Sequence, residues 1–238
     1  MPFGNLEAEA TRGAAGGAGR DGHGQLMARK ASGRAGEGSW RWGRTAETRR
    51  GMLEAACEVF VEQGFAAASV AEIVERAGSS VGSLYHHFGG KSELFLALFE
   101  DHQDEQDALA SGAVAKARAA GEEDPLELFV HGARAYLRGC WERRDLVRLF
   151  MDGDAPPGFE LVRRTRTREW VRRNAILLRA GTEPEDRVVV AVLTTVIGEA
   201  GREVAGCESQ AEASRVIGTA LELIRRLDPL AAPRVPDA

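Results

Sequence analysis

Residues 69 to 91 read SVAEIVERAGSSVGSLYHHFGGK, and this stretch decides the fold. Ser69, followed three positions later by Glu72, forms a capping box that starts a helix. Gly78 then supplies a turn, because glycine adopts positive φ at little cost. A second short helix follows, with Leu84 placed to pack inward. Two short helices joined by a glycine-containing turn indicate a helix-turn-helix, whose second helix enters the major groove of DNA.

Helical patterning continues on both sides of this motif. Apolar residues recur at helical spacing, and further helix-start signals lie at Asp124, Thr182 and Ser209, each followed three positions later by glutamate. The β-branched run 188–190 leaves one buried strand open as an alternative. We therefore predict an all-α chain of roughly nine helices. The expected spans are 45–63, 70–77, 81–87, 91–118, 126–143, 146–152, 158–180, 184–206 and 210–227.

Composition divides the chain into four parts. Residues 1–44 contain 11 of the 28 glycines and few periodic apolar residues, so we expect a disordered basic tail. Residues 45–95 form the predicted helix-turn-helix DNA-binding domain of three helices, and residues 96–228 form a second helical domain. Residues 229–238 are expected to be a flexible C-terminal tail.

Charge is unevenly distributed along the 238 residues. The net charge of -5 argues mildly against a general polyanion binder. Residues 1–44 hold 7 basic and 4 acidic residues, whereas residues 45–95 hold 4 basic and 7 acidic ones. We therefore expect weak, salt-sensitive non-specific DNA affinity, supplemented by the tail.

Several classes of protein are not favoured by the sequence. Cys57, Cys140 and Cys207 are too far apart for a zinc or redox motif, and no apolar run is long enough for a membrane span or signal peptide. We expect a cytoplasmic protein with no catalytic residues, metal, cofactor or membrane contact. One remote alternative is an all-α serine hydrolase using Ser80, because the sequence around it matches G-x-S-x-G; that motif requires a preceding strand, and here a helix is expected.

The stretch from the first predicted helix to Lys91 resembles the DNA-binding domain of the TetR/AcrR family of bacterial regulators. The resemblance rests on Glu62-Gln-Gly-Phe65, Ser69-Val70, Ile73, Ala77-Gly78, the run from Gly82 to Phe88, and Lys91-Ser-Glu-Leu94. It implies a homodimeric repressor that binds palindromic double-stranded operator DNA and is released by a small-molecule effector. The alternative is a DNA-binding regulator, activating or architectural, that no small molecule induces.

The resemblance also implies which side chains contact DNA. It places Ser69 near a phosphate, Ser80, Val81 and Ser83 at base edges, Tyr85, His87 and Lys91 on phosphates, and His86 beside the groove. The family usually has lysine or another polar residue where this chain has Val81, which could contact a thymine methyl group. Shape readout or an added arm is then expected to contribute specificity.

Basic residues before the first helix are candidates for that arm. Arg41 and Arg44 flank Trp42-Gly43, and Arg49 lies at the start of the first predicted helix. Basic arms of this kind enter an adjacent minor groove. The alternative is a solvated linker.

The resemblance implies an effector pocket in the second domain and a dimer interface from the last two helices. Large side chains offer candidates for the pocket: Phe129, Tyr136, Trp141, Phe150 and Trp170. Candidates for the interface are Val196, Ile217, Leu221 and Ile224, with an intramolecular core helix as the alternative. Six arginines between residues 163 and 173 form either a solvated face or a site for an anionic effector.

Overall fold

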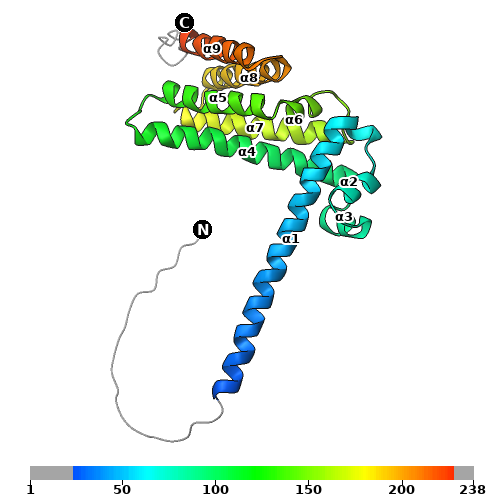
Figure 1. Ribbon diagram of the computed structural model, residues 1–238. Helices are drawn as coiled ribbons and strands as arrows, with labels where there is room; N and C mark the ends of the chain where they lie inside the picture. The colour runs from blue at the N-terminus through cyan, green and yellow to red at the C-terminus, as the bar shows by residue number, and fades with distance from the viewer. Residues whose placement is uncertain (1–23, 228–238) are drawn as a thin grey trace, which may run out of the picture. The chain divides into compact units, whose positions relative to one another are not determined.

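The structure is a computed structural model that describes the backbone of residues 24–227 and the side chains of residues 45–227. This part of the chain contains nine helices and no strand, which confirms the predicted fold class (Figure 1). The helices are α1 (Gly24–Ala67), α2 (Val70–Arg76), α3 (Val81–Phe88), α4 (Lys91–Ala119), α5 (Pro125–Glu142), α6 (Arg144–Leu149), α7 (Phe159–Leu177), α8 (Pro184–Gly206) and α9 (Gln210–Leu227). The run 188–190, the alternative strand, lies within α8.

The first helix begins earlier than predicted. We expected a start at residue 45, whereas α1 begins at Gly24. Residues 24–44 include leucine, methionine, alanine, arginine and lysine, whose helix propensity is good despite the intervening glycines. The side chains of Arg41 and Arg44, and all of residues 1–23, lie outside the described residues. The chain separates into two units at Ala46, and the following description concerns the unit that starts at Glu47.

Local signals set most helix starts. The Ser69 hydroxyl accepts a hydrogen bond from the Glu72 N–H at 3.1 Å, and Asp124 accepts one from the Leu126 N–H at 2.7 Å. The predicted capping box at Thr182 is wrong by one residue. Pro184 occupies the first turn of α8, where its missing N–H is tolerated, and the Asp186 carboxylate accepts from the Glu183 N–H at 3.4 Å.

The part of the chain from Glu47 onward contains two apolar cores. One joins α1, α2, α3 and the start of α4 to side chains from α6 and α7, and Phe95 lies at its centre. The Phe95 ring packs edge-on against Phe60, Phe150 and Phe159, with centroids 5.3–5.4 Å apart. The predicted domains therefore share a core across residue 95, and the division of the chain into four parts stays a prediction.

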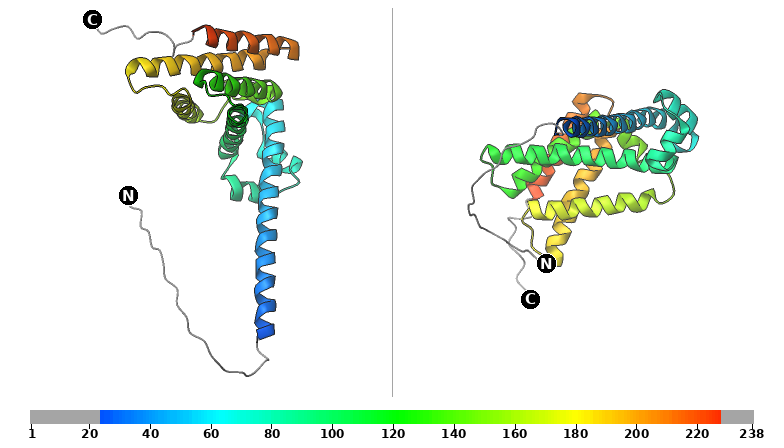
Figure 2. Two further views of the ribbon diagram at one scale, coloured as in Figure 1. Left: turned by 90° about the vertical axis from the view of Figure 1, so that its left-hand side faces the viewer. Right: turned by 90° about the horizontal axis from the view of Figure 1, so that it is seen from below.

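The second core lies between α5, α8 and α9. Figures 1 and 2 show α8 and α9 side by side, stacked on α5. Between residues 24 and 227, no helix combines the length and hydropathy needed to cross a membrane.

Candidate DNA-binding surface and ligand cavity

The turn between α2 and α3 is fixed by backbone geometry and one cap. Gly78 has a φ of +57°, which favours glycine over any residue with a side chain. The Ser80 hydroxyl accepts a hydrogen bond from the Ser83 N–H at 3.2 Å and thereby starts α3. Leu84 is fully buried and holds the inner face of α3 against the core. The orientation of α3 is therefore set by its cap and its buried leucine.

The outer face of α3 is open to solvent. Val81 and Tyr85 are 45% and 55% exposed, and their spacing of four places them on one face. Of the other predicted DNA contacts, Ser69, Ser80 and His86 are exposed. Ser83 and His87 are half-buried. The described structure thus leaves the start of α3 accessible to a groove.

Arg49 lies next to the end of α3. Its guanidinium carbon is 5.1 Å from the centre of the Phe88 ring, and the side chain is exposed. This cation–π contact holds the arginine beside α3 without neutralising its charge.

Lys91 has a structural role that the sequence did not predict. Its ammonium donates hydrogen bonds to the carbonyls of Phe65, Ala66 and Ala68 at 2.8, 3.1 and 2.9 Å. An ammonium has three donors, so the predicted phosphate contact would require one of these bonds to break. Lys91 fixes the start of α4 to the end of α1.

Arg76 forms ion pairs with three of the carboxylates that make residues 45–95 acidic. Its guanidinium pairs with Glu58 at 3.7 Å, Glu62 at 2.5 Å and Glu72 at 2.8 Å. The hydrogen bond from Arg76 lowers the pKa of Glu62 below its ordinary value. Sequence reasoning missed this cluster because its members come from two helices. It reduces the negative charge that DNA would meet near α2.

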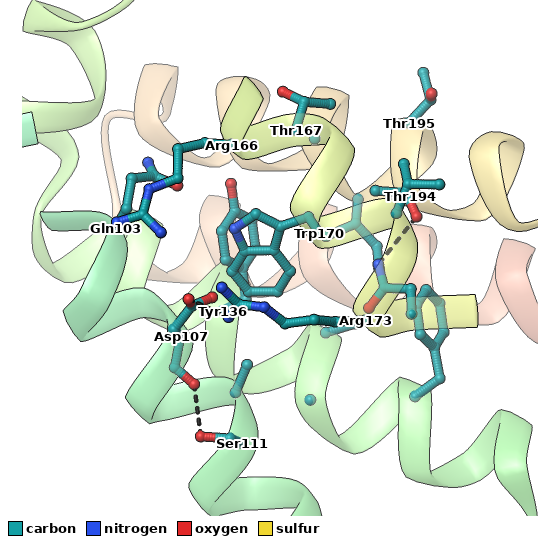
Figure 3. Close-up of a pocket in the computed structure, with 18 of the residues that line it drawn as sticks. Gln103, Asp107, Ser111, Tyr136, Arg166, Thr167, Trp170, Arg173, Thr194 and Thr195 are labelled. Atoms are coloured by element: carbon teal, nitrogen blue, oxygen red, sulfur yellow. Dashed lines mark hydrogen bonds and ion pairs between the residues drawn. The ribbon is translucent and has the colours of Figure 1, made fainter. Parts of the chain in front are cut away.

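A cavity of about 710 Å³ lies between α4, α5, α7 and α8 (Figure 3). Phe129, Tyr136, Phe150 and Trp170, four of the five residues proposed from the sequence for an effector pocket, line this cavity. Trp141 does not line it and instead packs under Arg144, whose guanidinium carbon is 4.7 Å from the ring centre. The volume falls in the range of small-molecule sites.

The segment 163–173 contributes three of its six arginines to the cavity lining. Arg163, Arg166 and Arg173 line it, whereas Arg164, Arg168 and Arg172 do not. Arg118 and Arg202 also line the cavity, so five arginines line it in total. These two come from α4 and α8, which are distant in sequence from α7, and sequence reasoning missed them.

His102 is a buried polar residue in the cavity wall. Its side chain is 4% exposed and its Nδ1 has no hydrogen-bond partner among the described residues. Burial, assisted by the nearby Arg143 charge, lowers the pKa of His102 to about 4. The imidazole is therefore neutral at physiological pH.

The predicted dimer residues mostly face inward. Ile217, Leu221 and Ile224 are 7%, 1% and 0% exposed, because they form the face of α9 that packs on α5 and α8. Val196 is half-buried against the same core. The prediction that Ile217, Leu221 and Ile224 lie at a surface interface is therefore wrong. The exposed large apolar residues of these two helices are Val188, Val192, Leu223 and Leu227.

Ser80 shows no hydrolase arrangement. It is an exposed helix cap preceded by α2 and a turn, rather than by the strand that a nucleophile elbow requires. Across the described residues, no group of three or more histidine, cysteine, aspartate or glutamate side chains could hold a metal ion.

Comparison with known proteins identifies the DNA-binding segment. Residues 52–98 match the family described as bacterial regulatory proteins, tetR family. The transcriptional activator FasR of Mycolicibacterium smegmatis is 51% identical over 59 residues, 24% of this chain and 27% of FasR. The transcriptional repressor AcnR of Corynebacterium efficiens is 45% identical over 51 residues, 21% of this chain and 27% of AcnR. The chain therefore matches less than a third of the length of these two relatives.

Solved structures extend the likeness to the rest of the fold. A TetR-family transcriptional regulator from Pectobacterium atrosepticum has 25% identity and a TM-score of 0.54, covering 81% of this chain and 98% of that one. A regulator from Aquifex aeolicus has 22% identity and a TM-score of 0.59, covering 75% and 98%. The comparisons therefore identify residues 52–98 as a tetR-family domain, and the described chain shares the fold of solved TetR-family transcriptional regulators.

Proposed function

We propose that this protein is a homodimeric, ligand-responsive repressor that binds palindromic operator DNA through α3. The observation that supports DNA binding most directly is the open face of α3, with Val81 and Tyr85 exposed on a helix that a cap and a buried leucine fix in place. Recognition helices of this motif place their N-terminal residues against base edges. Such a regulator acts in the cytoplasm, where bacterial DNA lies.

Base recognition on this surface is expected to be sparse. Ser80, Val81 and Ser83 offer hydroxyls and one apolar contact, without an arginine, asparagine or glutamine that could form a bidentate bond to a base. Tyr85, His87 and Arg49 are placed for phosphate contacts, which set position rather than sequence. We infer that DNA shape supplies part of the specificity.

Dimerisation is proposed to use the exposed faces of α8 and α9. Val188 and Val192 on α8, and Leu223 and Leu227 on α9, lie at corresponding distances from the short connection between the two helices. A twofold through this face would present two α3 helices to half-sites about 34 Å apart. The effector would favour a different spacing, so effector and DNA would weaken each other's binding equally.

A second candidate is an activator without small-molecule induction. The relative FasR is named an activator, whereas AcnR is named a repressor. Transcription of a gene next to the bound site, measured with and without the protein, distinguishes activation from repression.

Selection of genomic fragments bound by the full chain, followed by fluorescence anisotropy, tests DNA binding. We expect a palindromic site and a loss of affinity of about tenfold or more for Tyr85→Ala or Val81→Glu. Ile176→Ala changes a side chain on α7 that is 74% exposed, and it serves as the control. Equal affinity of all three variants and the wild type would rule out α3 as the recognition helix.

A further inference from the structure

The cavity has a predominantly cationic lining. Five arginines line it, against two carboxylates, those of Asp107 and Glu199. Three further carboxylates that pair with these arginines, from Asp104, Glu160 and Glu169, lie outside the lining. The arginines thus belong to the lining, whereas Asp104, Glu160 and Glu169 do not.

Two of the ion pairs connect α7 to α4. Arg166 Nη2 lies 2.9 Å from Asp104 Oδ1, and Arg173 pairs with Asp107 through Nη1 and Oδ2. Figure 3 shows both arginines extending from α7, with the Arg173 guanidinium beside Asp107. At its start α7 also packs on α4, because the Phe159 ring lies 5.3 Å from Phe95 and 4.9 Å from Phe99 between centroids. Further along α7, the buried residue is Asn174, and the charge pairs supply the described link to α4.

Both arginines keep capacity for another anion. Arg173 is half-exposed, and its hydrogen bond to Asp107 uses one of five N–H donors. Arg166 is bonded to Asp104, whose side chain is 70% exposed, and to Glu169. Each pair has one exposed partner, Asp104 or Arg173, whereas the Arg166 and Asp107 side chains are mostly covered. Asp104 can return to water at low cost, but Asp107 would remain mostly covered, so a competing anion must bind Arg173 more strongly than Asp107 does.

The remaining wall is elongated and mostly apolar, with polar side chains that include His102, Gln103 and Asn174. Along α4 the lining runs from Phe99 to Arg118, about 28 Å of helix. The apolar part of the lining includes Phe99, Phe129, Val147, Phe150, Leu177 and Ile197. A ligand that fits this cavity combines a long apolar body with a group that guanidinium binds.

We propose that the cavity binds an amphipathic anion, an apolar molecule with one carboxylate or phosphate group, which replaces Asp104 and Asp107 on Arg166 and Arg173. This inference names the ligand class of the effector site and so rests on the proposed ligand response. The anion would break the two pairs between α7 and α4 while its apolar part fills the cavity. Planar guanidinium groups bind carboxylate and phosphate through paired hydrogen bonds, which suits them to this exchange.

Isothermal titration of the full chain tests the charge preference. Dodecanoate, dodecyl phosphate, dodecanol and dodecyltrimethylammonium share one apolar chain and differ in their head group; each is used below its critical micelle concentration. We expect both anions to bind at least about tenfold more tightly than the alcohol and the ammonium compound, because hydrogen bonds to charged groups are the stronger ones. Similar affinity for all four, or binding of none, would overturn the proposal.

Matched variants test the residues. Arg166→Gln and Arg173→Gln should each weaken dodecanoate binding about tenfold or more and leave dodecanol binding unchanged. Arg172→Gln, on the same helix but outside the lining, should bind like the wild type. Asp104→Asn should bind dodecanoate more tightly, because Arg166 is no longer held by that carboxylate. Anion selectivity that survives in both cavity variants, or weaker binding by Asp104→Asn, would contradict the exchange.

Operator binding is then measured separately with dodecanoate present. If dodecanoate binds selectively but DNA stays bound, the anion site is supported and the proposed ligand response is contradicted. Release of DNA by dodecanol as readily as by dodecanoate would support a ligand response and reject the anion site.

Discussion

The Asp154 carboxylate accepts the backbone N–H of Ala66 with both oxygens, at 3.1 Å to Oδ1 and 3.0 Å to Oδ2. Ala66 lies in the last turn of α1, and Asp154 lies in the loop that leads into α7. The loop approaches so closely that a Cβ on Gly64, where φ is +77°, would collide with this carboxylate. The end of the first helix is thereby joined to the helix that supplies Arg166 and Arg173 to the cavity.

Removing this link should reduce the coupling between ligand and DNA. We expect Asp154→Ala to lower the coupling free energy by about 0.5–2 kcal/mol, because the loop that leads into α7 would no longer be hydrogen-bonded to α1. Operator affinity with and without dodecanoate measures that coupling, if dodecanoate proves to be an effector. Asp152→Ala, an exposed change in the same loop, should keep the wild-type coupling. Unchanged coupling in Asp154→Ala would show that the signal passes elsewhere.

Lys91 should matter for stability rather than for phosphate binding. Replacing it with methionine leaves the carbonyls of Phe65, Ala66 and Ala68 without their shared donor. We expect the free energy of unfolding to fall by at least about 2 kcal/mol. The slope of log affinity for DNA against log salt should stay constant, whereas loss of a phosphate contact would reduce it by about 1. Lys116→Met, at the exposed far end of α4, is the control for both measurements.

Two kinds of substitution distinguish the proposed dimer face, the exposed apolar residues of α8 and α9, from the core beneath it. Leu223→Glu and Val192→Glu place a charge on exposed positions and should yield folded monomers in sedimentation experiments. Ile217→Ala should instead lower the free energy of unfolding by about 2–5 kcal/mol and leave the folded protein dimeric. Folded dimers of both glutamate variants would move the interface to another surface.

His102 should make the protein sensitive to mild acid. Its pKa is about 4 in the folded chain against an ordinary value of 6.5, so the unfolded chain binds the extra proton between those two pH values. Stability is therefore lost as the pH falls from about 6.5 to about 4, by on the order of 3 kcal/mol. Chemical denaturation across this range should show a smaller loss for His102→Leu, which has no proton to gain. Parallel profiles for variant and wild type would show that other groups cause the acid sensitivity.

The helix-turn-helix was predictable because its signals are local. The Ser69 cap, Gly78 and the buried Leu84 act within a few residues of one another, and each has the expected place in the structure. The starts of α2, α5 and α9 followed equally local caps. The predicted start of α8 at residue 184 agrees with the structure, but its cap is Glu183 rather than Thr182, because the Pro184 ring fits the first position of a helix.

Contacts between distant segments could not be predicted in the same way. An amphipathic pattern shows that Ile217 and Leu221 share a face, but it does not show whether that face packs within the chain or against a second copy. The Lys91 bonds depend on how α4 meets α1, and the cavity arginines of α4 and α8 join those of α7 only after folding. These features follow from packing rather than from spacing along one helix.

The aromatic core around Phe95 has a consequence for chimaeric regulators. Exchange of DNA-binding modules between relatives is simplest where a module ends at a clean junction. Here a cut at residue 95 would separate Phe60 and Phe95 from Phe150 and Phe159, whose rings complete the same cluster. A transplanted module will therefore need the recipient's matching aromatic side chains, because a smaller residue there would leave a void beneath the recognition surface.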